Sequence, residues 1–524
     1  MSNKYFQDLS KKNRRHLLIH SLVSTFALMT GGLSGSVAMA QSTKVLTVGS
    51  PFSPLSMDPS LSGNGRAGVH LSPAYEPLVR TTADGKFAPA LATSWSISPD
   101  SKEVSFTLRQ DAKFSDGELV TAEAVKKSIE YFVSKKGPFS ANLATMTGIE
   151  ILDKFKLKIK MSVPQPALMS LFDAYFLSGD IISPKALEKP DQLANSTFGA
   201  GPYKLDPSAS ISGKSYTYLP NEHYYEKSRI KWDKVVITVY EDQNAGIQAM
   251  KAGQLKLLVS DPFTGNANAA NLPAHMRIIS DPIQWTGIIL TDREGVYQPE
   301  LKDIRVRQAI NYALDRKLIS NALFGKLADP TLQLQSKGFM GNDPALESRY
   351  PYNPEKAKAL LAEAGYKDGF ELKLQYVNNT LSRFLTMAIA GQLKKVGIKV
   401  VTEEFPNFGA MNNAARTKKM AALVFNSNSG VPNLARFQTL DPKGSLNFYG
   451  NEDATLTKLV SEAALLPLDK AEVAWKKVYA HVVELAWFAP VVASHTVYFA
   501  SKDVKTPRIG QSVVLDLIDV VPAK

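Results

Sequence analysis

The chain contains 524 residues, 44% of them hydrophobic and 21% charged, and this ordinary globular composition excludes wholesale disorder, collagen-like repeats and a coiled-coil rod. It has no cysteine, which excludes disulfides, thiolate metal sites, a cysteine nucleophile and a lipid-bearing cysteine. The first 40 residues hold five basic residues and one acid, so +8 of the formal net charge of +12 is spread over the remainder, which favours a solvated surface over nucleic-acid binding.

Residues 1–40 have the pattern of a secretory signal peptide. A basic segment ends at Arg14-Arg15, an apolar stretch runs from Leu17 to Met29, and Ala38-Met39-Ala40 provides small residues for cleavage before Gln41. The paired arginines resemble a twin-arginine export signal, and the sequence leaves that route and the general secretory route open. By either route we expect a soluble protein in the periplasm of a Gram-negative cell.

The first elements after the leader alternate between strand and helix patterns. Apolar residues predict strands at residues 45–48, 104–109 and 155–160, the last two with the period of two that buries one face. Thr121 is the expected N-cap of a helix that extends to Val133, with its apolar residues on one stripe. This alternation indicates α/β domains.

Two later helices carry clear start and stop signals. Asn353-Pro354 begins a helix that ends at Gly365, and the helix at residues 381–396 ends at Gly397, after which a strand restarts. Clusters of Gly, Pro and Asn predict loops at residues 261–273 and 426–433.

The sequence contains no convincing catalytic or nucleotide-binding motif. Gly213-Lys214-Ser215 has the tail of a phosphate loop, but Ser208 stands where the first glycine should be, so we expect a surface loop. The five histidines after the leader are not spaced to share a metal. Scattered carboxylates leave a two-carboxylate hydrolase open, but no pattern favours one, and the chemistry is typical of binding.

Several segments together resemble the extracellular solute-binding proteins, family 5, which serve peptide, nickel and opine ABC importers. They follow one another in the order of that family and cover nearly all of the chain after the leader: Ala90–Trp95, Ala112–Gly117, Gly199–Leu205, Asp303–Arg316, Ala357–Gly365 and Gln392–Ile398.

These motifs have structural roles of their own. Gly199 and Gly201 are expected to supply positive φ angles in a turn. Asp303 is expected to cap a helix whose apolar residues face the core, while Arg305 and Arg307 face elsewhere. Because these residues identify a fold and need not touch a ligand, they carry function by analogy only.

The resemblance implies an α/β, two-lobed periplasmic binding protein fold (type II-like), with an extra α/β domain inserted in the first lobe. Placed on this chain, lobe I would use residues 41–76, 200–283 and 494–524. The inserted domain would be residues 77–199, and lobe II would be residues 284–493.

Solutes in hinged α/β proteins bind between the lobes, where aromatic and polar groups line the site. From chain order we place four consecutive residues of the first lobe there: Phe52, Ser53, Pro54 and Leu55. Trp285 and the loop that contains Asn428, Gly430 and Val431 are the candidates from the second lobe, and a core position is an equal alternative for Trp285.

One departure from the family pattern bears on the ligand. Family members that take free dipeptides resemble one another in a Gly-Asp-Pro-Asp stretch whose first aspartate pairs with the substrate ammonium. This chain has Val431 at that position, which puts recognition of a free amine in doubt. Arg383 matches an arginine that holds the substrate carboxylate in dipeptide binders, and an exposed structural arginine is the alternative.

The resemblance therefore predicts the substrate-binding component of an ABC importer that captures a peptide or peptide-like solute. The same fold could instead bind an opine, a sugar-derived acid or a nickel chelate, and a secreted hydrolase and a periplasmic chaperone are less favoured alternatives. We expect no catalysis and no cofactor. The expected partners are an inner-membrane permease with separate ATPase subunits, and the protein is expected to be a monomer.

Overall fold

The structure is a computed structural model that describes residues 43–62, 68–165, 168–429, 436–444, 446–466, 468–512 and 515–524. The leader, Gly430 and Val431 lie outside the described residues. Among the described residues, no helix is long and apolar enough to cross a membrane.

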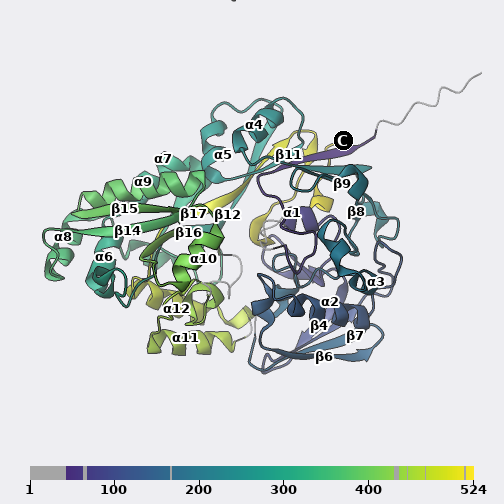
Figure 1. Cartoon of the computed structure of the whole chain (residues 1–524), viewed down its shortest axis with the longest axis horizontal. Helices are drawn as coiled ribbons and strands as arrows, with labels where there is room; N and C mark the ends of the chain where they lie inside the picture. Colours follow the sequence, from purple (N-terminus) through teal and green to yellow (C-terminus); the bar gives the residue numbers. More distant parts are fainter. Residues whose placement is uncertain are drawn as a thin grey trace, which may run out of the picture. The chain divides into compact units, whose positions relative to one another are not determined.

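An 11-stranded mixed sheet is the main element of residues 43–524 (Figure 1). Its strand order is β15-β14-β16-β12-β17-β11-β1-β10-β9-β8, and β13 pairs separately with β17. The strands are β1 (Val45–Ser50), β8 (Tyr203–Leu205), β9 (Ser215–Pro220), β10 (Lys234–Val239), β11 (Leu257–Ser260), β12 (Met276–Leu290), β13 (Ala328–Pro330), β14 (Phe370–Val377), β15 (Ile398–Phe405), β16 (Ala422–Asn428) and β17 (Phe488–Ser501).

Two long strands join the two ends of this sheet. β12 has 15 residues and β17 has 14, and they pair antiparallel from Met276 opposite Ser501 to Ile289 opposite Phe488. The register shifts between Pro282 and Gln284, near the middle of the pair. One end of the pair carries β11, β1, β10, β9 and β8, the first strand group; the other carries β16, β14 and β15, the second strand group.

A separate four-stranded antiparallel sheet has the order β4-β5-β7-β6. Its strands are β4 (Ala92–Ile97), β5 (Glu103–Leu108), β6 (Met146–Asp153) and β7 (Lys156–Met161), and helix α2 (Ala122–Ser134) packs beside it (Figure 1). Thr121 caps α2 by accepting the Ala124 N–H at 3.2 Å, which confirms the predicted start. The predicted strands at 104–109 and 155–160 are confirmed as β5 and β7.

The remaining α-helices cover the sheets and connect their strands. They are α1 (Gly68–Leu71), α3 (Pro184–Leu187), α4 (Gln243–Lys251), α5 (Pro262–Ala269), α6 (Ile304–Tyr312), α7 (Arg316–Leu323), α8 (Pro354–Glu363), α9 (Thr380–Lys394), α10 (Phe408–Arg416), α11 (Ala454–Ala464) and α12 (Glu472–Glu484). The predicted ends of α8 and α9 are confirmed, since Gly365 and Gly397 follow them with φ angles of +93° and +92°.

Two loop predictions were wrong or incomplete. Residues 262–269 form α5, because the Asp261 carboxylate accepts the Thr264 N–H at 2.9 Å and Pro262 occupies the first turn. This start signal outweighs the glycine and asparagines that favoured a loop. β16 also extends through Asn428, so the first residues of the predicted 426–433 loop are strand.

Two expectations, one about backbone angles and one about a side chain, also need correction. Gly199 and Gly201 do not have positive φ angles; a Cβ at either position would lie within 2.5 Å of the backbone of Ala74, so close approach is what requires glycine there. Arg307 is buried, and its guanidinium donates to the carbonyls of Leu301 at 2.7 Å and Lys302 at 2.9 Å. These hydrogen bonds fix the residues that precede α6 against the buried side of the helix.

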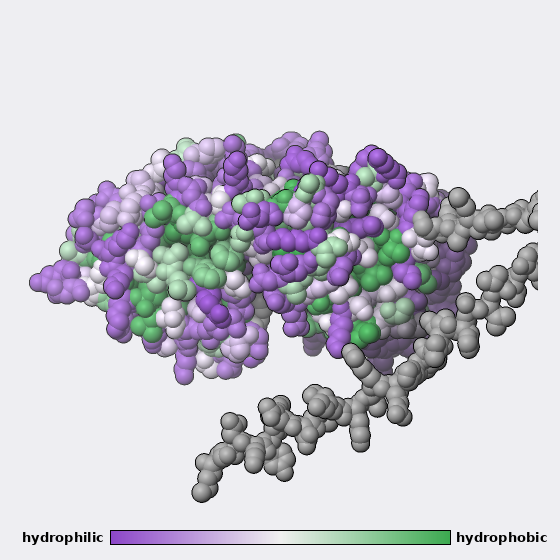
Figure 2. Space-filling model, turned by 90° about the horizontal axis from the view of Figure 1, so that it is seen from above, coloured by the Kyte–Doolittle hydropathy of each residue, from purple (hydrophilic) through white to green (hydrophobic). Residues whose placement is uncertain are grey.

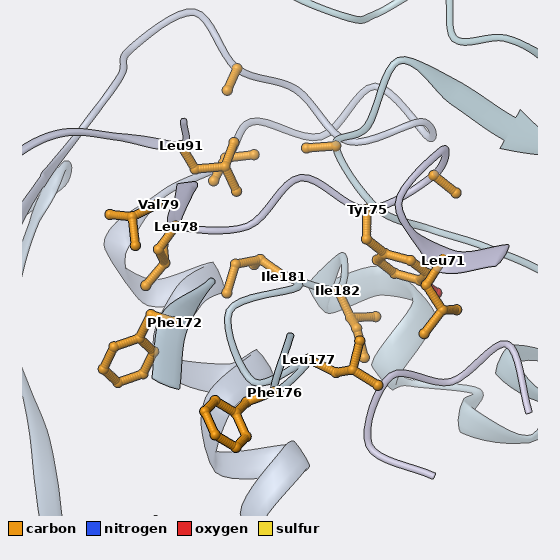
Figure 3. Close-up of a cluster of buried hydrophobic side chains, with 14 of the residues drawn as sticks. Leu71, Tyr75, Leu78, Val79, Leu91, Phe172, Phe176, Leu177, Ile181 and Ile182 are labelled. Atoms are coloured by element: carbon orange, nitrogen blue, oxygen red, sulfur yellow. The ribbon is translucent and has the colours of Figure 1, made fainter. Parts of the chain in front are cut away.

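One buried apolar cluster fixes the position of the short helix α1. Figure 3 shows side chains from residues 71–91 packed with side chains from residues 172–182. Leu71 and Tyr75, at the end of α1 and just after it, are at most 1% exposed. Because α1 also carries His70, this packing sets where the imidazole of His70 lies.

The surface in Figure 2 is largely hydrophilic, with separate apolar patches. The exposed large apolar side chains of α7 and α9 are Leu318, Phe384 and Met387.

Candidate functional site

The second strand group places three strand ends at one edge. β14 pairs parallel with both β15 and β16, so the carboxyl ends of all three strands lie together. The chain leaves β14 through α9 to β15 on one side and returns through α10 to β16 on the other side. Such a reversal is where open α/β sheets bind ligands. We call the last two residues of β14, β15 and β16, with the residues that follow each strand, the second carboxyl edge.

The first strand group repeats this arrangement. β1 pairs parallel with β10 and with β11, and the chain crosses from β10 through α4 to β11 on the opposite side of β1. Ser50, Val239 and Ser260, with the residues that follow them, form the first carboxyl edge. Each end of the 11-stranded sheet therefore has its own reversal point.

Strand register brings the two carboxyl edges toward each other. Ser260 at the end of β11 lies opposite Val497 of β17, and Asn428 at the end of β16 lies opposite Gln284, which in turn lies opposite Ser494 of β17. β11 runs antiparallel to β17 while β16 runs in the same direction as β17, so their carboxyl ends point toward each other. The separation along β17 is three residues, or about 10 Å at roughly 3.3 Å per residue.

A direct side-chain contact joins the helices that follow the two edges. α5 begins two residues after β11, and α9 begins three residues after β14. Phe263 of α5 stacks on Phe384 of α9, with ring centroids 4.8 Å apart and an interplanar angle of 19°. The region between the two carboxyl edges, bordered by β12 and β17, is therefore the candidate solute site.

Buried, uncharged groups hold the loop of the first carboxyl edge. The Ser50 hydroxyl donates to the Phe52 carbonyl at 2.9 Å, and Nε2 of His70 lies 2.8 Å from the same carbonyl. Since a carbonyl only accepts, Nε2 carries the proton. Burial lowers the pKa of His70 to about 4, against the opposing effect of this hydrogen bond, so the ring is neutral at physiological pH.

The predicted residues of this loop differ in exposure. The Ser53 hydroxyl lies 2.9 Å from the Tyr216 hydroxyl, Pro54 is buried, and Leu55 is 82% exposed. The loop thus has a fixed base at Phe52 and Ser53 and an exposed apolar tip at Leu55.

Charged and exposed groups mark the second carboxyl edge. Arg383 lies in the first turn of α9, where its Nη2 donates to Asn378 Oδ1 at 2.9 Å and to Glu404 Oε2 at 3.3 Å. The Tyr376 hydroxyl donates to the same Glu404 oxygen at 2.8 Å. The Arg383 side chain is 51% exposed and that of Glu404 is 35% exposed. Arg383 therefore presents a cation to solvent at the second carboxyl edge, next to an acid.

The end of β16 is held by hydrogen bonds to β12 and to the loop that contains Leu334. The Asn426 amide donates to Gln284 Oε1 at 2.7 Å, and the Ser429 N–H donates to the Ile283 carbonyl at 2.7 Å. The Ser429 hydroxyl donates to the Leu334 carbonyl at 2.9 Å. Asn428 lies between these anchors and is 6% exposed. Contact of Asn428, Gly430 and Val431 with a solute stays a prediction.

Trp285 lies on β12 between Ser427 of β16 and Ala493 of β17, beside the candidate site. Its side chain is 1% exposed and packs edge-on against Phe488, with ring centroids 5.7 Å apart. In this conformation the ring belongs to the core of the second strand group, and its contact with a solute stays a prediction.

Three residues of the site were missed from the sequence: His70, Tyr376 and Glu404. Tyr376 and Glu404 are each the last-but-one residue of a strand, and they are directly paired in the β14–β15 register. If the strands β14 and β15 had been aligned at their carboxyl ends, Tyr376 and Glu404 would have been identified as neighbours. Among the described residues, no group of three or more His, Asp or Glu side chains is arranged to hold a metal ion.

Comparison with known proteins finds similarity to solute-binding proteins. The family described as bacterial extracellular solute-binding proteins, family 5 Middle, matches residues 86–442. The nickel-binding periplasmic protein of Escherichia coli (strain K12) is 29% identical over 391 residues, which cover 69% of this chain and 71% of that protein. A putative ABC transporter peptide-binding protein of Brucella ovis is 26% identical over 333 residues, and this chain spans 61% of its length.

Solved structures share the fold over almost the whole chain. The PBP AgaA of A. tumefacien R10, in complex with agropinic acid, is 26% identical with a TM-score of 0.77, covering 91% of this chain and 98% of that one. DppA of Helicobacter pylori, in complex with peptide STSA, is 21% identical with a TM-score of 0.77, covering 92% of this chain and 98% of that one, and shows the fold alone. The predicted α/β, two-lobed fold is confirmed. The chain belongs to the bacterial extracellular solute-binding proteins, family 5, the substrate-binding proteins of ABC importers.

Proposed function

We propose that this protein captures a small solute between its two carboxyl edges and delivers it to an inner-membrane permease that works with separate ATPase subunits. The observation that carries the proposal is the convergence of both edges on β12 and β17, three residues apart along β17. Two reversal points that face each other form one site from two halves, and such a site can close by a hinge movement.

We propose a solute that carries a carboxylate, which includes peptides, peptide-like molecules, opines and sugar-derived acids. Arg383 supports this because it is exposed at the second carboxyl edge and can offer a bidentate fork to a carboxylate. The named relatives and neighbours bind nickel, peptide STSA and agropinic acid, so their range includes both peptide and non-peptide ligands. A nickel chelate stays an alternative.

For the domain division we propose the boundaries expected from the sequence: lobe I at 41–76, 200–283 and 494–524, an inserted domain at 77–199, and lobe II at 284–493. The division is supported by strand content, since the first strand group, the four-stranded sheet and the second strand group fall mainly into these three parts. The register shift between Pro282 and Gln284 supports a boundary there. We propose a monomer without catalytic activity.

The proposed location is the periplasm of a Gram-negative cell, after cleavage before Gln41. N-terminal sequencing of protein released by osmotic shock tests it: Gln41 is expected, and Met1 or fractionation with membranes would contradict it. Replacing Arg14 and Arg15 with lysine should block export if the twin-arginine route is used. Unchanged export would assign the general secretory route.

The test of solute capture is native mass spectrometry of protein purified without refolding. We expect one or a few small molecules of defined mass, released on unfolding and chemically unchanged after long incubation. Recovery of chemically converted solute would favour the hydrolase alternative. Purified protein that carries no small molecule, and is stabilised by none in a solute screen, would contradict the proposal.

A further inference from the structure

Arg383 has a carboxylate of the protein itself beside it. Glu404 Oε2 lies 3.3 Å from Arg383 Nη2 and accepts the Tyr376 hydroxyl at 2.8 Å. Tyr376 is 7% exposed, and burial, followed by its hydrogen bond to Glu404, raises its pKa, so the hydroxyl keeps its proton. Glu404 is thereby held in place by a buried donor while its carboxylate remains accessible beside the guanidinium.

This arrangement changes what the departure at Val431 implies. The sequence lacks the acid that receives a substrate ammonium in dipeptide binders, which argues against free-amine recognition. Glu404 supplies a different acid, from a different strand, at the same carboxyl edge. A ligand carboxylate that takes Nη2 of Arg383 competes with Glu404 for that donor. A ligand that also carries a positive nitrogen can replace the Arg383–Glu404 contact with one favourable contact to each residue.

We propose that Arg383 and Glu404 form a receptor for a zwitterionic amino-acid head, with the ligand carboxylate on Arg383 and its charged nitrogen on Glu404. The proposal rests on the proposed function and names the ligand class of that site. Glu404 is then the specificity-determining residue, and Tyr376 is a positioning residue that acts through Glu404. Neighbouring Phe384, which is 41% exposed and stacked on Phe263, offers an apolar surface to the rest of such a ligand.

The test compares zwitterions with matched molecules whose nitrogen is acylated and uncharged. Two pairs are alanine and glutathione, each with its N-acetyl form. The third pair is glutamine with N-acetylglutamine. Calorimetric titration of refolded, solute-free protein is expected to show at least one zwitterion bound tenfold or more tightly than its acylated partner.

The variants separate the roles of the two residues. Glu404→Gln is expected to reduce the preference for the zwitterion to less than threefold, while Arg383→Gln weakens both members of the pair by tenfold or more. Glu371→Gln is the matched control, because Glu371 pairs with Lys399 at 2.5 Å at the opposite end of the same two strands. It should leave the preference unchanged.

Three results would overturn the proposal: an unchanged preference in Glu404→Gln, tighter wild-type binding of the acylated partner, or no wild-type binding of any of the six probes. Tighter binding of acylated molecules by Glu404→Gln would indicate that Glu404 only competes with the ligand carboxylate. The proposed function has its own readout, since a small molecule that co-purifies with the protein would uphold solute capture whichever of these results is obtained.

Discussion

The two carboxyl edges have the same topology, but the loop after β1 at the first edge and the start of α9 at the second are held by different kinds of side chain. At the first edge, buried and uncharged groups hold the loop after β1, with His70 and Ser50 both on the Phe52 carbonyl. At the second edge, the prominent groups are the exposed pair Arg383 and Glu404. A buried hydrogen bond stabilises the fold because losing it leaves an unsatisfied polar atom, whereas an exposed ion pair contributes about 0–1 kcal/mol. We therefore expect the first edge to contribute mainly to the stability of the fold and the second edge to contribute mainly to selectivity for the solute.

Removal of His70 should give the largest loss of stability. His70→Ala empties a fully buried site and leaves the Phe52 carbonyl with one donor fewer, so we expect the free energy of unfolding to fall by about 3 kcal/mol. This fall in the free energy of unfolding is measured by urea unfolding, monitored by tryptophan fluorescence. Exposed His275 is the matched control, and His275→Ala should change stability by less than about 0.5 kcal/mol. Equal effects of the two substitutions would contradict a stabilising role for the first edge.

The free energy of unfolding should depend on pH because of the same buried imidazole of His70. Burial lowers the folded-state pKa of His70 to about 4, so the unfolded chain binds this proton more readily between about pH 6.5 and pH 4. The contribution of neutral His70 is present above pH 6.5 and lost as pH falls, by roughly 3 kcal/mol in total. Asp173, whose pKa burial raises to about 6, acts in the opposite direction, so wild type must be compared with His70→Gln. Parallel stability profiles for the two proteins would contradict the prediction.

At the second edge, substitution should separate binding from stability. We expect Arg383→Gln to weaken binding of the co-purifying solute by tenfold or more, which corresponds to about 1.4 kcal/mol. The same change should alter the free energy of unfolding by less than about 0.5 kcal/mol, because the ion pair with Glu404 is half exposed. Titration calorimetry and urea unfolding measure the two effects. A stability loss as large as that of His70→Ala would remove the contrast between the edges.

The smallest expected effect lies in the loop of the first edge itself. Ser53 and Tyr216 share a partly buried hydrogen bond of 2.9 Å, and Tyr216 also accepts the Gly213 N–H at 2.9 Å. A double-mutant cycle with Ser53→Ala and Tyr216→Phe should give a coupling energy of about 1 kcal/mol in unfolding. Additive effects would show that the two hydroxyls do not hold the loop together.

Local signals in the sequence were sufficient for much of the fold. Period-two alternation located β5 and β7, and the caps at Thr121 and Asn353 located the starts of α2 and α8. The misassigned α5 shows the limit, since its glycine and asparagines favour a loop until Gly265 packs against Leu327 and Val497. Such packing, together with the start signal at Asp261 and Pro262, overrides the loop propensity of these residues.

The site was harder to predict because it depends on register between distant strands. The sequence singled out Arg383, but its partner Glu404 is 21 residues away on another strand and becomes adjacent only through the β14–β15 pairing. His70 likewise reaches Phe52 only because the apolar cluster around Leu71 and Tyr75 fixes α1. Side chains brought together by pairing and packing leave no periodic pattern in the sequence.

Closure of the two carboxyl edges on a solute can be measured directly by a distance between spin labels. The chain has no cysteine, so Leu55→Cys with Thr380→Cys places one exposed label at each edge without background. Double electron–electron resonance should give a shorter and narrower distance distribution for protein that retains its co-purified solute than for refolded, solute-free protein. Leu55→Cys with Ile211→Cys, both exposed positions in loops next to β1 and β9 of the first strand group, is the control, and its distance distribution should not change. An unchanged Leu55–Thr380 distribution in protein with confirmed solute would contradict closure between the two edges.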